Sequence, residues 1–306
     1  MKVRFILFLA LLTGLAFSCQ SGAPEQQGQA GPQVKLGAPL IENEGVKIDY
    51  RYCGEGDTTL LFVHGWCINK EYWEPQLDEF CTKYRIVAVD LPGFGQSGDN
   101  RTDWSLEKFG SDIARVIDVL DLPNVILIGH SMGGDVMLEA AIQRPDKVIG
   151  MIGVDNFKDV RANYSPEEEQ SFEEVIAALK ADFPGTAAAY AETALFHPNT
   201  DSLVKQRVIN DFRNAKPGPA TAAIENLIHY GQRETELLQK VGAKLYLINS
   251  DATPTDEGAL TRYCRAGHEV IPIHATGHYP MIEKPEEFNM QLQLAIQKII
   301  HDTHRR

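Results

Sequence analysis

The sequence has few cysteines, few basic side chains and no hydrophobic run long enough to cross a membrane. Its 306 residues include five cysteines, and no two of them have the C-x-x-C spacing of a zinc or dithiol redox site. Lys and Arg number 29 against 42 Asp and Glu, which gives a formal net charge of −13. So acidic a chain argues against binding to nucleic acid. We therefore expect no nucleic-acid partner and no metal site.

A short apolar run at the N-terminus predicts export. Lys2 and Arg4 precede the run, which extends over residues 5–17 and is too short for a spanning helix. Residues 1–18 are therefore predicted to be a secretory signal peptide. A small residue followed by Cys19 at the end of the run resembles a bacterial lipobox, which predicts a lipid anchor on Cys19 and a place in the cell envelope. The alternative is ordinary cleavage nearby and a soluble periplasmic or secreted protein.

Residues 19–40 are rich in Gln, Gly, Ala and Pro and have few apolar side chains. This composition predicts a flexible tether. An exported protein can form disulfides. Four cysteines follow the tether, and their positions along the chain leave every pairing open; they are Cys53, Cys67, Cys81 and Cys264.

From about residue 41 the chain alternates between patterns typical of strands and of helices. Continuous apolar runs predict strands buried on both faces, and 3.6-residue periodicity predicts the helices between them. The expected strands are 46–52, which starts the sheet in antiparallel orientation, then 59–63, 85–89, 125–128, 148–154, 244–249 and 269–273. The expected helices are 70–80, one that begins at Ser105, 133–143, 256–265 and 285–300. This order predicts an α/β fold with a mostly parallel sheet flanked by helices.

The alternation stops between residues 157 and 232. No strand pattern occurs there, and helical stretches are separated by Pro and Gly, beginning with an acidic amphipathic helix at Pro166. We therefore predict a core made of residues 41–156 and 233–306, with residues 157–232 inserted as a helical cap.

The strongest functional motif is Gly129-His130-Ser131-Met132-Gly133. It matches G-x-S-x-G and lies between an expected buried strand and an expected helix, the context in which this motif carries a nucleophile. A strand that turns sharply into a helix strains the backbone of the serine and makes its hydroxyl project, while flanking side chains would clash with neighbouring backbone. The helix N-terminus favours developing negative charge. Ser131 is the predicted nucleophile.

Two further loops make the chain from residue 41 to 300 resemble the α/β-hydrolase family. They are His64-Gly65-Trp66 after one expected strand and the D-x-P-G-x-G-x-S loop at residues 90–97 after the next. The resemblance implies an oxyanion hole formed by the backbone N–H groups of Trp66 and Met132. It also implies a substrate pocket near His64, Gly65, Phe94 and His130, although we interpret His64 mainly as a support for its loop.

The same resemblance predicts the general base. In this family a histidine follows the last strand, and His278 in Thr276-Gly277-His278-Tyr279-Pro280 occupies that place. It would take the proton of Ser131 and return it to the leaving group. His274 is the weaker candidate, because it is expected to lie within the strand.

The acid partner of His278 has two leading candidates, Asp155 and Asp251, and a weaker third, Asp256. The family usually places it after the strand at 244–249, but Thr253 stands at the usual position, and Asp251 lies two residues earlier. The other known place is after the preceding strand, where Asp155 follows the nucleophile by about two dozen residues. We prefer Asp155 and keep Asp251 as the alternative, since either gives the chain order Ser, Asp, His.

These features together predict a serine hydrolase that cleaves a small, largely apolar ester, thioester or lactone through an acyl-enzyme, without a cofactor. The partners expected are therefore a small acyl substrate and, through Cys19, a membrane. Hydrolysis of a carbon–carbon bond and perhydrolysis use the same triad and stay open. A non-catalytic, ligand-binding member of the fold is the alternative from another functional class.

Overall fold

The computed structural model describes residues 35–36 and 39–303. The predicted signal peptide, the lipidation site Cys19 and most of the predicted tether lie outside the described residues. Within the described ranges, no helix combines the length and apolar character needed to cross a membrane.

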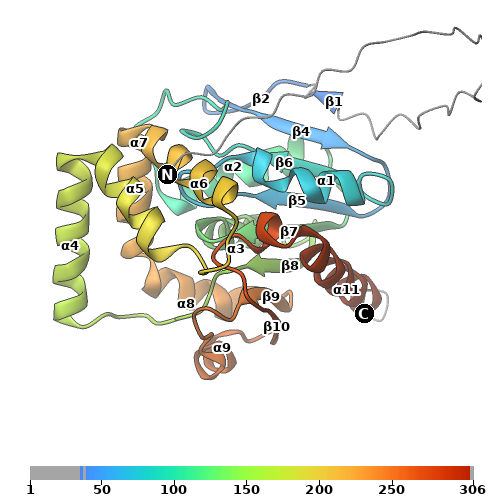
Figure 1. Ribbon diagram of the computed structural model, residues 1–306. Helices are drawn as coiled ribbons and strands as arrows, with labels where there is room; N and C mark the ends of the chain where they lie inside the picture. The colour runs from blue at the N-terminus through green and yellow to red at the C-terminus, as the bar shows by residue number, and fades with distance from the viewer. Residues whose placement is uncertain (1–34, 37–38, 304–306) are drawn as a thin grey trace, which may run out of the picture. The chain divides into compact units, whose positions relative to one another are not determined.

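The predicted α/β architecture is confirmed, with one eight-stranded sheet at its centre (Figure 1). The strand order is β1-β4-β6-β5-β7-β8-β9-β10, and a separate hairpin pairs β2 with β3. Strand β4 pairs antiparallel with β1 and β6, and the strands from β6 to β10 are parallel. The strands are β1 (Lys35–Leu36), β2 (Ile41–Asn43), β3 (Val46–Ile48), β4 (Tyr50–Cys53), β5 (Thr59–Val63), β6 (Arg85–Val89), β7 (Val125–His130), β8 (Val148–Val154), β9 (Leu245–Ser250) and β10 (His268–Ile273).

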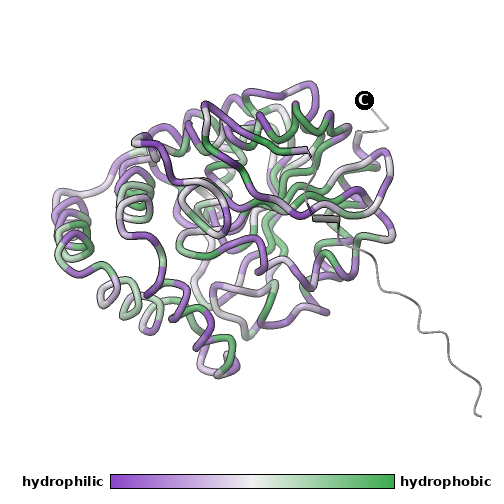
Figure 2. The backbone as a smooth tube through the Cα atoms, turned by 90° about the horizontal axis from the view of Figure 1, so that it is seen from above, coloured by the Kyte–Doolittle hydropathy of each residue, from purple (hydrophilic) through white to green (hydrophobic). Residues whose placement is uncertain are grey.

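Burial explains why these segments form the central strands. Every residue of β5, β7 and β9 is buried, as expected of parallel strands covered by helices on both faces. Figure 2 shows hydrophobic backbone gathered near the centre of the molecule. Because the carboxyl ends of parallel strands meet at one edge of the sheet, the loops after β5, β7, β8, β9 and β10 are brought together there.

Helices cover both faces of the sheet. Helix α11 packs on β8, β9 and β10 with α1 beside it, and α3 packs on β5, β7 and β8 with α2 and α8 against it. In Figure 1, α11 and α1 lie nearer the viewer than α2. The helices are the 3-10 helix η1 (Lys70–Trp73), α1 (Glu74–Phe80), α2 (Leu106–Val119), α3 (Met132–Gln143), α4 (Pro166–Ala181), α5 (Phe183–Ala194), α6 (Ser202–Asn214), α7 (Pro217–Ile228), α8 (Gly231–Lys240), α9 (Glu257–Tyr263), α10 (Pro280–Glu283) and α11 (Pro285–Thr303).

Helices α4 to α7 follow one another between β8 and β9 without an intervening strand. They lie together on the left in Figure 1. The connection between α5 and α6 contacts the loop after β10, because the His278 N–H donates to the Leu195 carbonyl at 2.8 Å. This helical segment therefore contacts the edge of the sheet at which the strands end.

Several boundaries differ from those expected. The strand expected at 46–52 is two strands, because the Asp49 N–H between them bonds the Ser97 hydroxyl at 2.8 Å instead of a strand. Strand β7 extends two residues further than expected, since Gly129 and His130 pair with β8. Helix α8 starts at Gly231, so it crosses the expected domain boundary at 232. The predicted tether also contributes residues 35–36 to the sheet, through pairing with β4.

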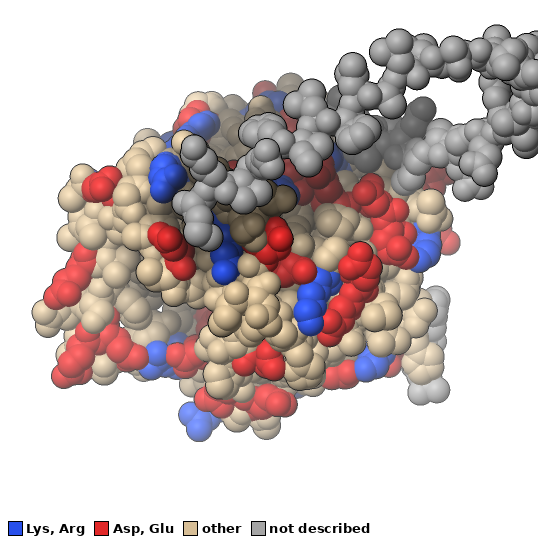
Figure 3. Space-filling model, viewed as in Figure 1, with Lys and Arg blue, Asp and Glu red and all other residues tan. Residues whose placement is uncertain are grey.

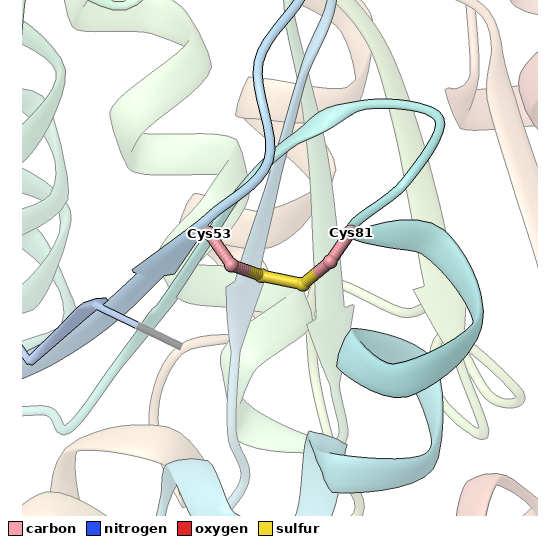
Figure 4. The surroundings of a disulfide bond; sticks show 2 residues. All are labelled: Cys53 and Cys81. Carbon is pink, nitrogen blue, oxygen red and sulfur yellow. A yellow bond between two sulfur atoms is a disulfide. The ribbon is translucent and has the colours of Figure 1, made fainter. Parts of the chain in front are cut away.

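A disulfide joins Cys53 at the end of β4 to Cys81 at the end of α1 (Figure 4). The other two described cysteines, Cys67 and Cys264, are buried free thiols. The sequence left this pairing open. The bond fastens α1 to the antiparallel side of the sheet.

Reduction of this disulfide is expected to destabilise the fold. A cross-link over a separation of 28 residues removes loop entropy from the unfolded chain, and this is worth about 3.5 kcal/mol. Urea unfolding with and without dithiothreitol should show a lower midpoint for the reduced protein. The double variant Cys53→Ser/Cys81→Ser should unfold at that lower midpoint in both conditions. Equal midpoints for oxidised and reduced wild type would contradict the expectation.

Candidate active site

Ser131 occupies the turn between β7 and α3. Its φ of +52° lies in the left-handed region, which a non-glycine residue rarely adopts. The turn is held by two hydrogen bonds, from the Ser131 N–H to Val154 O at 3.1 Å and from the Gly134 N–H to Ser131 O at 2.8 Å. The backbone strain expected from the sequence is therefore present at Ser131. The hydrogen bond to Val154 of β8 helps to hold the strained backbone in place.

The glycines on both sides of Ser131 allow this turn to pack. A Cβ atom on Gly129 would lie 2.3 Å from the Gly133 carbonyl oxygen, and one on Gly133 would lie 2.5 Å from the Val63 carbonyl oxygen. Both clashes are with backbone, which cannot move aside as a flexible side chain could. The G-x-S-x-G pattern is therefore a packing requirement of the turn.

The Asn156 side chain ties the turn to the loop after β8. Its Nδ2 donates to the carbonyls of Gly129 at 2.9 Å and Ser131 at 3.4 Å. Gly134 and Gly153 make room for it, because a Cβ on either would come within about 2 Å of the Asn156 amide (2.0 and 2.2 Å). The turn and the neighbouring loop are thus locked together.

The loop after β5 lies directly against Ser131. A Cβ on Gly65 would be 3.0 Å from Ser131 Cβ and 2.7 Å from His130 Nδ1. The backbone N–H of Trp66, the next residue, bonds no backbone carbonyl among the described residues. Met132 is the first residue of α3, so its N–H has no acceptor within the helix. The N–H groups of both residues, one on each side of the Ser131 turn, therefore have no backbone acceptor within the described residues.

His64 and Phe94, two of the residues expected near the pocket, are buried in the core. The His64 Nε2 accepts the Leu91 N–H at 2.9 Å, and its Nδ1 donates to the Gly65 carbonyl at 2.7 Å. Burial lowers the pKa of His64, so its ring is neutral. Phe94 packs edge-on against the His64 ring at 5.7 Å. The contacts of both side chains support the loop after β5.

His278 and Asp155 form a close pair. The His278 Nδ1 lies 2.6 Å from Asp155 Oδ2, and Asp155 is 6% exposed. His278 Nε2 makes no hydrogen bond within the described part of the chain. An imidazole bonded through Nδ1 to a carboxylate is held in the tautomer whose Nε2 can accept a proton.

Asp155 stays ionised in its buried position. Burial alone would raise the pKa of its carboxyl, but the hydrogen bond and charge of His278 and the Lys158 ammonium at 2.7 Å lower that pKa to about 2. The second carboxylate oxygen also accepts the Ser250 N–H at 2.9 Å. A fixed negative charge next to His278 stabilises the imidazolium form.

Asp251, the other candidate for the acid, does not contact His278. Its Oδ2 lies 2.7 Å from His274 Nδ1, and both side chains are about half exposed or more (48% and 67%). Strand β10 ends at Ile273, so His274 follows the strand instead of lying within it as expected. Asp251 and His274 therefore form a surface pair. Asp256 is used elsewhere, as the N-cap of α9.

His130 links the Ser131 turn to the His278 loop. Its Nε2 bonds the His278 carbonyl at 2.8 Å, and the two rings lie 4.7 Å apart. Burial and the nearby His278 lower the pKa of His130 to about 3, so the ring is neutral and donates through Nε2.

No hydrogen bond joins Ser131 Oγ to His278 in this structure, and in unliganded enzymes such bonds are often long.

The site has supporting residues that the sequence reasoning missed. Asn156 and Lys158 follow Asp155 closely, and Glu283 accepts the N–H groups on both sides of His278 (2.8 and 3.0 Å). Polar residues just after a buried strand were the available signal for the first two. Among the described residues, no group of three or more His, Cys, Asp or Glu side chains could hold a metal ion.

A family model described as the alpha/beta hydrolase fold matches residues 58–285. Pimeloyl-[acyl-carrier protein] methyl ester esterase of Yersinia enterocolitica is 34% identical over 78% of this chain and 93% of its own length. The dihydrolipoyllysine-residue acetyltransferase component of the acetoin cleaving system of Cupriavidus necator is 24% identical, over 82% of this chain and 66% of that protein. Among solved structures, a thermophilic esterase from Thermogutta terrifontis has a TM-score of 0.72 at 24% identity, covering 88% of this chain and 99% of its own.

The substitution Gly65→Ala tests the contact between the loop after β5 and Ser131. The new methyl group would push either the loop or Ser131 aside, and misplacement by about 1 Å costs about 100-fold in rate. We expect kcat/KM for p-nitrophenyl acetate to fall by that order. Gly218→Ala in α7, where nothing lies within 4 Å of the added atom, is the control and should keep wild-type activity. Equal rates for the two variants would show that the contact has no functional role.

Proposed function

Because the chain belongs to the α/β-hydrolase fold family and is a hydrolase, we propose that it cleaves small, largely apolar esters, thioesters or lactones with a Ser131-His278-Asp155 triad. The observation that carries the proposal is the 2.6 Å pair of His278 and Asp155, joined through His130 to the turn of Ser131. Pairing of Asp251 with His274 favours Asp155 as the acid. No cofactor is required for this chemistry.

The proposed reaction proceeds through an acyl-enzyme. Ser131 Oγ attacks the carbonyl carbon while its proton passes to His278 Nε2, and Asp155 stabilises the resulting imidazolium. The N–H groups of Trp66 and Met132 hold the oxyanion, and each such donor is worth about 3 kcal/mol. The imidazolium then protonates the leaving alcohol or thiol. Water, deprotonated by His278, releases the acid and restores Ser131.

The surroundings of Trp66 support an apolar acyl substrate. Its indole ring meets Phe183, Tyr190 and Phe212 edge-on, at centroid distances of 5.3 to 6.3 Å. These rings come from α5 and α6, and the Trp66 Nε1 donates to Ala220 O of α7 at 2.7 Å. We infer that residues 157–232 act as a cap whose aromatic face lies over the oxyanion loop.

Surface charge supports an uncharged substrate. The net charge is −13, and acidic side chains are widespread on the face shown in Figure 3. Repulsion slows the approach of anionic substrates. The names of the relatives that are esterases agree with an ester as substrate. The proposal also includes export of the protein and lipidation at Cys19. A soluble periplasmic or secreted form is the alternative to lipidation. These parts of the proposal rest on the sequence.

The substitution Ser131→Ala should abolish turnover. With p-nitrophenyl acetate, wild type should show a p-nitrophenol burst of about one equivalent followed by steady turnover, as expected when an acyl-enzyme accumulates. The variant should show neither. Turnover retained in Ser131→Ala would contradict the serine mechanism. A single burst without steady turnover in wild type would instead favour a ligand-binding member of the fold.

Separate substitutions of the two aspartates test the acid. Asp155→Asn should lower kcat about 10⁴-fold, because the amide stabilises the wrong tautomer of His278. Asp251→Asn, which breaks only the surface pair with His274, should stay within a fewfold of wild type. The reverse order of the two losses would overturn the assignment.

A further inference from the structure

Backbone hydrogen bonds hold the loop that carries His278. The His278 N–H donates to the Leu195 carbonyl at 2.8 Å, and the N–H groups on either side of it, those of Gly277 and Tyr279, both donate to the Glu283 carboxylate. Three consecutive peptide N–H groups are thus bonded, two of them by one side chain. The His278 carbonyl is bonded by His130. The loop is fixed on both sides of its central residue.

Glu283 uses both of its oxygens in this arrangement. Oε1 accepts the Tyr279 N–H at 3.0 Å, and Oε2 accepts the Gly277 N–H at 2.8 Å and the Thr200 hydroxyl at 2.5 Å. Only an ionised carboxylate is an acceptor at both oxygens, since a glutamine would turn an NH₂ group toward one of the N–H donors. Bonds to an ionised acceptor are also the stronger ones.

Thr200 belongs to the connection between α5 and α6, which lies directly on the His278 loop. Thr200 is 8% exposed, and its oxygen also accepts the His197 N–H at 3.0 Å. A Cβ on Gly277 would come within 2.5 Å of the Leu195 carbonyl oxygen and 2.7 Å of the His197 nitrogen. The two backbones therefore touch, and Gly277 is the residue that permits it.

We propose that Glu283 is a positioning residue for His278, and that Thr200 couples the α5–α6 connection to the catalytic base through it. The proposal rests on the proposed function, in which His278 Nε2 must face Ser131 while Nδ1 stays on Asp155. Glu283 does not touch the imidazole. It fixes the position of the backbone that carries the imidazole. Because Thr200 bonds Glu283, the helical segment that lies over the site also holds the base in position.

The test compares Glu283→Gln, Thr200→Val and their double variant by the kinetics of p-nitrophenyl acetate hydrolysis. Glu283→Gln should lower kcat between about 10-fold and 100-fold, while KM stays within twofold and the thermal midpoint within a few degrees. Thr200→Val should lower kcat by a smaller factor, because both N–H bonds to Glu283 remain. In the Glu283→Gln background the Thr200→Val effect should disappear, since the two side chains act as one unit.

Thr193→Val is the matched control. Thr193 is an exposed residue of α5 whose hydroxyl donates to the Ala189 carbonyl of the same helix, so the chemical change is the same without the link to Glu283. It should keep wild-type kcat. If Glu283→Gln unfolds, the comparison of Thr200→Val with Thr193→Val carries the test alone.

Three outcomes separate this proposal from the proposed function. Loss of turnover in Ser131→Ala together with wild-type kcat in Glu283→Gln and Thr200→Val would overturn the positioning role and leave the triad intact. A rise in KM at unchanged kcat would also overturn it, because the residues would then act on substrate binding. Turnover that survives Ser131→Ala would overturn the triad first.

Discussion

The backbone turn at Ser131 is the constraint on which the rest of the site depends. A non-glycine residue at φ +52° is unfavourable, and it persists because its surroundings fix it. Val154 bonds the Ser131 N–H, and Asn156 bonds the carbonyls of Gly129 and Ser131. The residue between them, Asp155, is the partner of His278. One short segment after β8 therefore supports the proposed nucleophile and also supplies the proposed acid.

His278, the proposed base, is also held by segments other than the one after β8. His278 follows β10, yet its loop is bonded to the connection between α5 and α6, to Glu283 of α10 and to His130 next to Ser131. Segments from distant parts of the sequence thus meet at the carboxyl edge of the parallel sheet. The helical segment between β8 and β9 contributes backbone and side-chain contacts to this arrangement, in addition to the aromatic rings around Trp66.

The sequence predicted the central fold because its signals are local. Strands β5, β6 and β8 have the expected bounds, since each is a continuous apolar run that polar or turn residues end. Strand β7 runs two residues past its expected end, through Gly129 and His130, because its pairing with β8 continues there. The four-residue helix α10 carries too little periodicity to be seen in a sequence.

The choice between Asp155 and Asp251 needed three-dimensional information. Both follow neighbouring parallel strands, so their positions along the chain place both at the same edge of the sheet. The register between β9 and β10 pairs Ser250 with Ile273, and the next residues, Asp251 and His274, therefore lie side by side. The role of Glu283 could not be predicted from the sequence for a similar reason. Its partners are backbone N–H groups, and their distance from the Glu283 carboxylate depends on how the loop folds.

If Ser131 is an activated nucleophile, a fluorophosphonate should label it covalently. Intact-mass spectrometry and peptide mapping would follow the reaction of the folded protein with one equivalent of the reagent. We expect a single adduct on the peptide that contains Ser131, formed in step with the loss of esterase activity. An adduct at another residue, or full activity in protein labelled at Ser131, would contradict this expectation.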